Sequence, residues 1–351
     1  MRHDRTVRVL VADDSATARY HLTQALLSTP QLRVIGEARN GEEVLQLAAQ
    51  LQPDVISMDI HMPRMDGLEA TRRLMMQHPT PVVVVSALLE HDLDLAFQAL
   101  QAGALAVVEK LPNTQHPTFA AKQQQLVKTL IAMSDVKVIR RGRTGQIAPN
   151  SVVESVNAPY PRIVPEILAI GASAGGPSAL NTLLNGLPLD LRIPIVVVQH
   201  LPHEFVAGFA HWLGKSSGWR VQVVTDGADL VPGVVHLSPG TAHLRVTRTL
   251  GKLSARLIAE RGDYRYQPAI DMLFESVAQS SGAASIGLIL TGMGEDGANG
   301  LLAMRQAGGR TLAQDQTSAV VFGMPGAAIE RGAVDEILPL SQLPAAILKY
   351  L

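Results

Sequence analysis

Near its start the chain contains the segment Val7-Arg-Val-Leu-Val-Ala-Asp-Asp-Ser15, in which a β-branched apolar run ends in two adjacent acidic residues. A short apolar run of this kind is typical of a strand buried in a parallel sheet. Four similar runs follow within the first 110 residues: Leu32–Ala38, Val55–Met58, Val82–Ser86 and Ala106–Val108. Segments with helical spacing alternate with them, near residues 15–28, 41–51, 66–77 and 91–102. This alternation predicts an α/β domain of (βα)5 type, with a parallel sheet covered by helices on both faces.

A second β/α series occupies the C-terminal half of the chain. Its strands are expected at Ile167–Ile170, Ile193–Val198, Val221–Val224, Val234–Leu237, Ser285–Leu290 and Arg310–Ala313. Between the two series, a Gln- and Ala-rich stretch at 116–134 is expected to form the last helix of the first domain, and a basic stretch with Gly and Pro follows it. We therefore expect a domain over residues 1–134, a linker over 135–162, and a doubly wound α/β domain over 163–351.

The composition excludes several kinds of chemistry. The 351 residues are 47% apolar and 17% charged, which is typical of a globular protein, and they include no cysteine. Disulfides, thiolate metal sites and a cysteine nucleophile are therefore excluded. The charged start Met1-Arg-His-Asp-Arg5 lacks the apolar core of a signal peptide, and runs such as Val82–Val85 are too short to cross a bilayer. We therefore expect a cytoplasmic location and no membrane insertion.

Charge is distributed unevenly along the chain, whose formal net charge is −1. Residues 1–110 carry 10 Lys and Arg against 14 Asp and Glu, residues 111–162 carry 7 against 2, and residues 163–351 carry 13 against 15. Both domains are thus mildly acidic, and neither is expected to have the electropositive face that nucleic-acid binding requires. The basic segment between them is most simply a solvated tether; its alternative role is a contact with acidic helices of a partner protein.

Polar residues stand where the strands of the first domain end. They are Asp13 and Asp14 after the first strand, Asp59 after the third, Ser86 at the end of the fourth and Lys110 after the fifth. Because the carboxyl ends of parallel strands meet at one edge of a sheet, the three carboxylates are expected to cluster, which is costly unless a cation such as Mg²⁺ joins them. One aspartate after a strand is more often a turn residue or a helix N-cap, but five such polar groups indicate a site.

This pocket suits phosphoryl transfer. A hydroxyl and an ammonium are groups that bind phosphoryl oxygens, and Ser86 and Lys110 supply them. The predicted mechanism is attack of Asp59 on a phosphoryl donor, while Mg²⁺ and Lys110 neutralise the charge that develops in the transition state.

Residues 6–130 resemble the receiver domain of bacterial response regulators. The match is carried by Asp13-Asp14, Met58-Asp-Ile-His-Met-Pro-Arg-Met-Asp-Gly67, Ser86-Ala87 and Lys110. The resemblance implies that Asp59 is the phosphoacceptor, that Asp13, Asp14 and Asp59 surround Mg²⁺, and that Ser86 and Lys110 serve as the switch residues.

Two positions depart from the receiver pattern. Leu111 stands between Lys110 and Pro112, where receivers usually have Pro directly after the lysine, so the geometry of this loop is left open. Val107 stands where an aromatic side chain is common, which questions the usual aromatic switch but not phosphorylation itself.

The second domain begins with a strand that runs into a glycine-rich turn, Glu166-Ile-Leu-Ala-Ile-Gly-Ala-Ser-Ala-Gly-Gly-Pro-Ser-Ala-Leu180. Ser173 lies at the turn and fits the G-x-S-x-G pattern of a nucleophile, and the following helix can offer N–H groups to an oxyanion. His200 ends the next strand, and Asp296 follows a later one in Thr291-Gly-Met-Gly-Glu-Asp-Gly297. Each residue alone is explained as well by a turn, a helix cap or a structural histidine. Together they predict a triad of Ser173, His200 and Asp296.

Two other classes of enzyme are disfavoured for this domain. In α/β-hydrolases the triad follows the order Ser, acid, His, whereas here the order is Ser, His, acid. A dinucleotide site requires G-x-G-x-x-G, which is absent, and the second strand ends in His200 where a ribose-binding acid is expected.

Residues 163–351 resemble the catalytic domain of the chemotaxis protein-glutamate methylesterases, the CheB family. The matching segments are Gly171-Ala-Ser-Ala-Gly-Gly-Pro177, Gln199-His200-Leu-Pro202, Pro239-Gly240, Thr291-Gly-Met-Gly-Glu-Asp-Gly297 and Gly323-Met-Pro-Gly-Ala-Ala-Ile329. With the receiver, the resemblance covers nearly the whole chain in the domain order of the family. Ala174 and Glu295 are small departures, since Thr and Asn or Asp are frequent there, and neither is a triad position.

The resemblance implies a function. The expected enzyme is a serine carboxylesterase that hydrolyses glutamyl methyl esters on the cytoplasmic helices of methylated chemoreceptors, with release of methanol, and that also deamidates receptor glutamines. Backbone N–H groups of Ala174 and Met293 are expected to form the oxyanion hole, and the esterase needs no cofactor. A chemotaxis histidine kinase is the expected phosphoryl donor, and the unphosphorylated receiver is expected to pack over the Ser173 cleft.

A second class of function remains open from the residues, in which the C-terminal half is a binding module for DNA or for a protein. DNA output would require a compact helix-turn-helix of positive charge, which the long, mildly acidic α/β domain does not offer. A non-catalytic adaptor is disfavoured because the serine, histidine and aspartate are all present.

Overall fold

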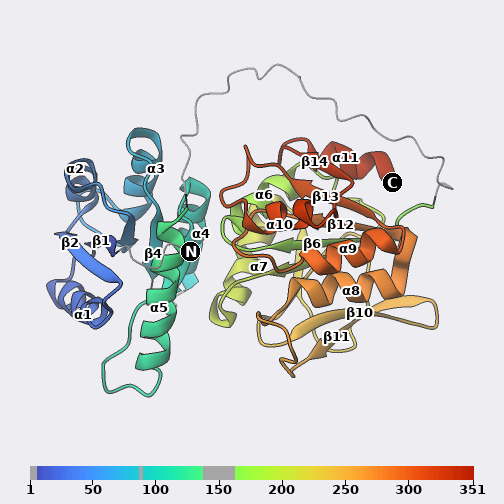
Figure 1. Cartoon of the computed structure of the whole chain (residues 1–351), viewed down its shortest axis with the longest axis horizontal. Coiled ribbons are helices and arrows are strands. Elements are labelled where there is room, and N and C mark those ends of the chain that lie inside the picture. Colours follow the sequence, from blue (N-terminus) through green and yellow to red (C-terminus); the bar gives the residue numbers. More distant parts are fainter. Residues whose placement is uncertain (1–5, 87–89, 137–162) are drawn as a thin grey trace.

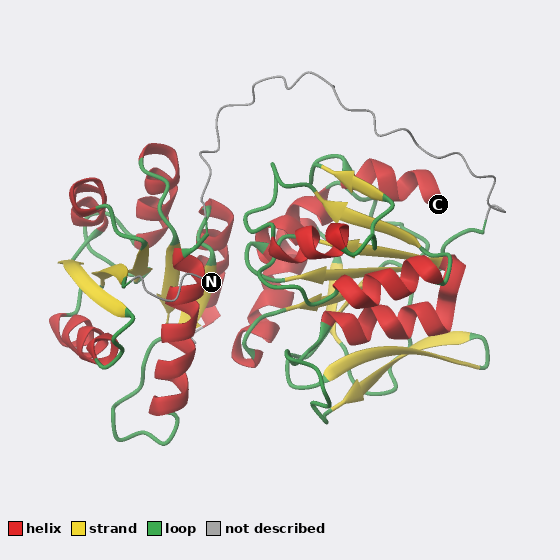
Figure 2. Ribbon diagram, in the orientation of Figure 1, coloured by secondary structure: helices red, strands yellow, loops and turns green. Residues whose placement is uncertain are grey.

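The computed structural model describes residues 6–86, 90–136 and 163–351, which form two α/β domains that lie side by side (Figure 1). The linker predicted for 135–162 lies outside the described residues beyond Val136, as do Met1–Arg5 and Ala87. Helices lie on both faces of each sheet (Figure 2). The predicted α/β class is therefore confirmed for both halves of the chain.

The N-terminal domain is built on a five-stranded parallel sheet with the strand order β2-β1-β3-β4-β5. The strands are β1 (Val7–Ala12), β2 (Leu32–Ala38), β3 (Val55–Met58), β4 (Val82–Ser86) and β5 (Ala106–Glu109). The helices are α1 (Ala16–Leu27), α2 (Gly41–Leu51), α3 (Gly67–Gln77), α4 (Glu90–Ala102) and α5 (Phe119–Ser134). The predicted elements differ by a few residues: β5 extends to Glu109, and α5 begins at Phe119 because Pro117 disfavours helix in the residue before it.

Side-chain caps begin the three helices that follow β1, β2 and β3. The side chains of Ser15, Asn40 and Asp66 each accept a hydrogen bond from the backbone N–H three residues further on. Such caps satisfy N–H groups that have no partner inside the helix. Asp66 is therefore a helix cap, whereas Asp13, Asp14 and Asp59 remain at the edge of the sheet.

The C-terminal domain is built on a seven-stranded parallel sheet with the order β14-β13-β12-β6-β7-β9-β8. The strands are β6 (Ile167–Ala172), β7 (Ile195–Gln199), β8 (Arg220–Val223), β9 (Val234–Leu237), β12 (Ser285–Ile289), β13 (Arg310–Gln314) and β14 (Glu336–Leu338). The helices are α6 (Gly176–Asn185), α7 (His203–Ser217), α8 (Ile270–Ser281), α9 (Ala298–Gln306), α10 (Gly323–Glu330) and α11 (Leu343–Tyr350), with a 3-10 turn at Gly282–Ala284. The chain runs outward from β6 through β7 and then returns to the other side of β6 at β12. This reversal is the switch point at which doubly wound sheets place their sites.

An antiparallel hairpin of β10 (His243–Thr249) and β11 (Lys252–Ile258) packs beside α8. The sequence patterns above do not predict this hairpin or the short strand β14. Leu244 and Val246 are buried and alternate with more exposed residues, which is the period of a strand that is covered on one face. The hairpin is therefore an addition to the doubly wound sheet rather than a part of it.

Alternate residues of β6 face two different cores. Leu168 and Ile170 pack with the cluster that includes residues of α6 and α7, whereas Ile167 and Ala169 pack with residues of α8 and α9. All four side chains are fully buried. Burial on both faces explains why this strand is a continuous apolar run in the sequence.

The two domains share one apolar cluster at the junction between them. Helix α4 of the N-terminal domain lies against α6 and α7 of the C-terminal domain. The ring of Phe97 lies 5.4 Å from that of Phe209 and 5.3 Å from that of Trp212. All three side chains are buried.

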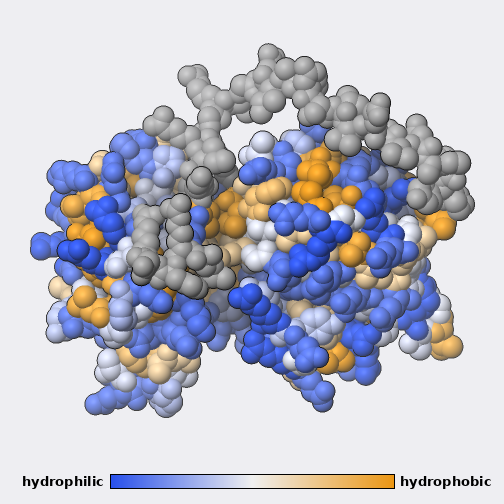
Figure 3. All heavy atoms as spheres, viewed as in Figure 1, coloured by the Kyte–Doolittle hydropathy of each residue, from blue (hydrophilic) through white to orange (hydrophobic). Residues whose placement is uncertain are grey.

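The face shown in Figure 3 is mostly hydrophilic, and its apolar side chains form small separate patches. Within residues 6–86, 90–136 and 163–351, no helix combines the length and the apolar character that a membrane span requires.

Replacement of Gly171 by Ala is expected to lower the free energy of unfolding of the C-terminal domain by about 1–3 kcal/mol, because the added methyl overpacks the core. A Cβ at this position would lie 2.3 Å from Cγ2 of Ile270 and 3.2 Å from the ring of Phe274. Urea denaturation followed by circular dichroism measures the change. Gly326→Ala in α10 is the matched control, because its Cβ would meet the Phe322 ring at an ordinary 3.4 Å. Equal losses in the two variants would contradict the packing argument.

Candidate functional site

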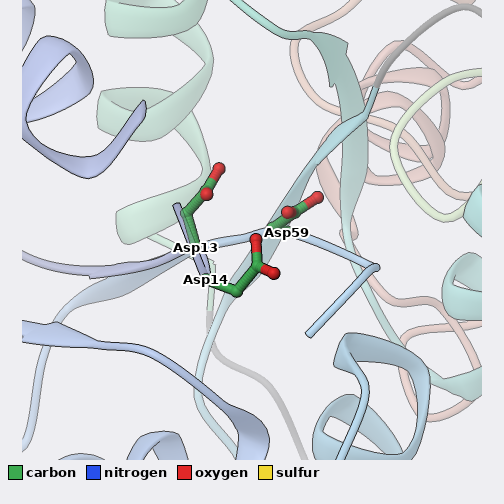
Figure 4. A group of neighbouring side chains, drawn as sticks. All are labelled: Asp13, Asp14 and Asp59. Atoms are coloured by element: carbon green, nitrogen blue, oxygen red, sulfur yellow. The ribbon is translucent and has the colours of Figure 1, made fainter. Parts of the chain in front are cut away.

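Three carboxylates gather at the carboxyl edge of the N-terminal sheet (Figure 4). Asp13 and Asp14 follow β1 and Asp59 follows β3, and one oxygen from each lies within 4.8 Å of the others. Asp13 and Asp59 are buried and Asp14 is exposed. A group of oxygen ligands of this kind is typical of a Mg²⁺ site.

Lys110 supplies a positive charge to this acidic cluster. Its Nζ lies 3.0 Å from Oδ2 of Asp13 and 2.8 Å from Oδ2 of Asp59. The backbone N–H of Lys110 donates to the carbonyl oxygen of the buried Ser86 at 2.9 Å, which places the lysine over the end of β4. The predicted residues of the first site therefore lie together.

Burial controls the electrostatics of the cluster. Burial raises the pKa of the Asp59 carboxyl, and the hydrogen bond and charge of Lys110 offset only part of this rise. Burial works to lower the pKa of Lys110, but the hydrogen bonds and charges of Asp59 and Asp13 outweigh it, so that the pKa is raised. The Lys110 ammonium thus pairs with two carboxylates of a group of three, so the cluster still favours the binding of further positive charge.

The lysine loop also belongs to the boundary between the domains. Leu111, the residue that separates Lys110 from Pro112, is half-buried and packs against an apolar cluster of the N-terminal domain. Ala174 and Val320 of the C-terminal domain pack against the same cluster. The loop of the acidic cluster and the loop after β6 therefore border one apolar region.

Ser173 and His200 occupy neighbouring positions at the switch point of the C-terminal sheet. Ser173 directly follows β6 and His200 directly follows β7, the strand paired with it. The side-chain amide of Gln199 donates to the carbonyl oxygens of Ser173 at 2.9 Å and His200 at 3.0 Å. Gln199 is buried and so fixes the two backbones relative to each other.

Asp296 reaches His200 from the loop after β12. Its Oδ2 lies 2.8 Å from Nε2 of His200 and also accepts a hydrogen bond from Ile270 N at 2.8 Å, while its Oδ1 accepts one from Asp271 N at 3.1 Å. Burial works to raise the pKa of Asp296, but these bonds and the charge of His200 outweigh it and lower the pKa. The carboxylate therefore orients the imidazole and holds the N-terminus of α8 at once. It does not cap α9, which begins at Ala298 after the N-cap residue Gly297 and has no side-chain cap.

Of the two contacts that the predicted triad requires, the one between His200 and Asp296 is formed, and the one between Ser173 and His200 is not. Within the described residues, no hydrogen bond joins the Ser173 hydroxyl to His200, and Nδ1 of the imidazole is without a hydrogen bond. Ser173 N donates to the carbonyl oxygen of Thr291 at 3.0 Å, which ties the serine to the loop after β12. The structure thus brings His200 and Asp296 together and places Ser173 at the next strand end.

The two expected oxyanion donors lie in the loops beside Ser173. Ala174 precedes Gly175, which has a φ of +76° and is the N-cap residue of α6. The carbonyl oxygen of Gly292 accepts hydrogen bonds from Gly323 N at 3.0 Å and Met324 N at 2.9 Å, which holds the loop that carries Met293. In the described part of the chain, the N–H groups of Ala174 and Met293 donate to no protein group.

The fold brings two further residues to this site that the sequence patterns do not identify. The buried Thr291 donates its hydroxyl to Ala174 O at 2.9 Å and accepts from Val321 N at 2.8 Å, so it joins three loops. The ring of Tyr266 is stacked on the His200 imidazole, with centroids 4.8 Å apart and planes inclined by 20°. Tyr266 lies in a long loop before Pro268, where nothing in the sequence signals a contact with His200.

Comparisons with known proteins agree with this architecture. Residues 168–347 match the family model of the CheB methylesterase, and residues 9–116 match that of the response regulator receiver domain. A protein-glutamate methylesterase/protein-glutamine glutaminase of Myxococcus xanthus is 44% identical over 99% of this chain and 97% of its own length, and one of Syntrophus aciditrophicus is 39% identical over 98% of both. The crystal structure of the CheB methylesterase catalytic domain of Thermotoga maritima aligns with a TM-score of 0.52 and 35% identity, and covers 53% of this chain and 99% of that one.

Replacement of Asp271 by Asn is expected to remove a pH-dependent loss of stability. Burial raises the pKa of Asp271 to about 6, and the charges of Asp296 and Glu275 add to the rise. Because the folded pKa lies above the ordinary 3.8, the contribution of Asp271 to stability is present at low pH and is lost as the pH rises through about 6. After allowance for solvent screening, the variant gains about 1–2 kcal/mol relative to the parent between pH 4 and pH 7.

Melting temperatures measured across this pH range test the Asp271 prediction. The asparagine can still accept the hydrogen bond that Gly300 N donates to Asp271 at 2.8 Å. Asp190→Asn, at an exposed aspartate of the same domain, is the control. A difference between Asp271→Asn and the parent that stays constant with pH would contradict the prediction.

Proposed function

The chain belongs to the CheB methylesterase family, and we propose that its Ser173, His200 and Asp296 hydrolyse glutamyl methyl esters of chemoreceptors and release methanol. The chain is a protein-glutamate methylesterase/protein-glutamine glutaminase and carries a response regulator receiver domain. The observation that carries the proposed triad is the 2.8 Å contact between His200 Nε2 and Asp296 Oδ2 beside Ser173 at the switch point. The assignment of these three residues is the proposal.

The proposed reaction begins with attack of the Ser173 hydroxyl on the ester carbonyl carbon. His200 takes the hydroxyl proton at Nδ1, because its Nε2–H is held by Asp296. Rotation of the serine side chain closes the remaining distance, since Gln199 already fixes both backbones. Asp296 stabilises the imidazolium that forms.

The tetrahedral intermediate then collapses to an acyl-enzyme. The N–H groups of Ala174 and Met293 receive the oxyanion. The C–O bond of the ester breaks, and methanol leaves with the proton from His200. Water, deprotonated by His200, attacks the acyl-enzyme and restores Ser173 with a free glutamate. With a glutamine side chain the same steps release ammonia.

We propose that Asp59 is the phosphoacceptor that controls this reaction. Its carboxylate attacks the phosphorus of a donor, and Lys110 balances the added charge. Asp13, Asp14 and Asp59 would hold Mg²⁺, which offsets the negative charge of the phosphoryl group when it is bound. The donor class is a chemotaxis histidine kinase, and the proposed location of the chain is the cytoplasm, where kinase and receptor helices meet.

Control is proposed to act at the junction of the domains. Without phosphorylation, α4 packs on α6 and α7 through Phe97, and Leu111 borders the same apolar region as Ala174. Phosphorylation of Asp59 shifts the equilibrium toward an open arrangement in which receptors reach Ser173. A shift from 1:99 to 99:1 would need about 5.5 kcal/mol, and a smaller shift gives partial activation.

Ser173→Ala is expected to reduce methanol release from methylated receptor membranes by about 10⁴-fold or more, since the nucleophile is lost. Methanol is measured in the presence of a phosphoryl donor. Ser178→Ala, five residues further on in α6, should keep the parental rate because no step uses this hydroxyl. Parental turnover in Ser173→Ala would refute the proposed nucleophile.

Asp59→Asn is expected to abolish the rise in methanol release that acetyl phosphate and Mg²⁺ produce in the parent chain. Phe97→Ala should instead raise release without a donor, because loss of the ring weakens the contact with Phe209 and Trp212. Tyr20→Ala, at an exposed aromatic residue of α1, controls for changes elsewhere in the receiver. Full activation of Asp59→Asn by the donor would exclude Asp59 as the phosphoacceptor, and an unchanged basal rate in Phe97→Ala would exclude inhibition through this contact.

A further inference from the structure

The His200 imidazole is held on its face as well as at its edge. Asp296 binds the edge through Nε2 at 2.8 Å, and the ring of Tyr266 stacks on the face at a centroid distance of 4.8 Å. An offset stack with nearly parallel planes is a favoured arrangement of two such rings. Two contacts at right angles fix both the tilt and the rotation of a ring that a single hydrogen bond would leave free to turn.

The loop that carries Tyr266 is itself fixed. The guanidinium of Arg261 donates to the carbonyl oxygen of Arg265 at 2.7 Å. The side-chain amide of Gln267 donates to the carbonyl oxygen of Ala259 at 2.8 Å. The guanidinium of Arg265 lies 5.7 Å from the centroid of the Tyr266 ring. These contacts form a closed turn on either side of Tyr266 in the sequence.

A buried histidine joins the two ends of this loop to β10. Nδ1 of His243 accepts a hydrogen bond from Ala269 N at 3.0 Å, so that its Nε2–H faces the carbonyl oxygen of Arg261 at 3.2 Å. Burial lowers the pKa of His243, which keeps the ring neutral and able to accept at Nδ1. The turn is thereby attached to the hairpin and to the start of α8.

The hydroxyl end of Tyr266 reaches the loop of the expected oxyanion donor. A Cβ added to Gly294 would lie 3.2 Å from the Tyr266 hydroxyl oxygen, and Gly294 has a φ of +84°. Tyr266 therefore extends from the face of His200 to the backbone next to Met293. A side chain at position 294 would compete with it for this space.

We propose that Tyr266 is a positioning residue of the esterase site. Its ring holds the imidazole in the orientation in which Nε2–H is donated to Asp296 and Nδ1 is left for the Ser173 proton. Its π face also stabilises the imidazolium formed in each half of the reaction. The inference rests on the proposed triad, but the state of the His200 ring can be measured without turnover.

Kinetics of Tyr266→Leu and Tyr266→Phe in the full chain, phosphorylated with acetyl phosphate and Mg²⁺, test the role of the ring. Tyr266→Leu should lower kcat for methanol release about tenfold, the upper range of an aromatic pair, and leave KM within about twofold. Tyr266→Phe keeps the stack and should restore kcat to within about twofold of the parent. A parental kcat in Tyr266→Leu, or an equal loss in Tyr266→Phe, would overturn the proposal.

Proton NMR of histidine-labelled protein gives a readout that does not depend on the esterase reaction. The Nε2–H of His200 is expected as a downfield resonance, identified by its absence in His200→Gln. It should persist in Tyr266→Phe and broaden through solvent exchange in Tyr266→Leu. A sharp signal in Tyr266→Leu would overturn the inference, whatever Ser173→Ala shows about the reaction.

A variant of the neighbouring tyrosine separates the ring stack from general loosening of the loop. The hydroxyl of Tyr264 donates to Glu275 at 2.6 Å, and Tyr264→Phe removes this bond but leaves the Tyr266 ring in place. Parental kcat and a sharp His200 signal in this variant support the proposal. The same losses as in Tyr266→Leu would assign the effect to the loop and reject the specific role of the stack.

Discussion

The position of β6 between β7 and β12 is the constraint on which the esterase domain depends. Parallel pairing on both sides aligns the carboxyl ends of three strands that are far apart in the sequence. His200 and Asp296, 96 residues apart, therefore meet at 2.8 Å, with Ser173 on the strand between them. The glycines of these loops let the backbones approach one another closely. At Gly292, for example, a Cβ would lie 2.8 Å from that of Ser173.

Both domains use the carboxyl edge of a parallel sheet to gather charge, but they balance it differently. In the receiver, Lys110 pairs with the carboxylates of Asp13 and Asp59, and Asp14 adds a third carboxylate to the cluster, so the cluster favours additional cations. In the esterase, Asp296 is balanced by His200 and by two N–H groups at the start of α8. The first arrangement suits a site whose charge changes, and the second suits a carboxylate that keeps its charge through a reaction cycle.

Much of the fold was accessible from the sequence because buried parallel strands are continuous apolar runs. The five receiver strands and the main esterase strands lie within a few residues of the predicted positions, and Asp13, Asp14 and Asp59 lie close together at the strand ends. The hairpin β10–β11 was missed because its exposed face breaks the apolar pattern. The contacts of Gln199, Thr291 and Tyr266 were not predicted for another reason: each joins residues distant in sequence, and only the fold reveals them.

The aromatic contact at the domain junction gives the molecule an optical reporter of its own. The chain has two tryptophans. Trp212 stacks on Phe97 across the junction, whereas Trp219 is buried inside the esterase domain with its indole N–H donated to Leu184 O at 3.0 Å. Separation of the domains would expose the indole of Trp212 to solvent and leave that of Trp219 buried. The fluorescence emission of Trp212 would then shift to longer wavelength while that of Trp219 stayed constant. Intrinsic fluorescence would therefore report separation of the receiver from the esterase domain as it occurs, without an added dye.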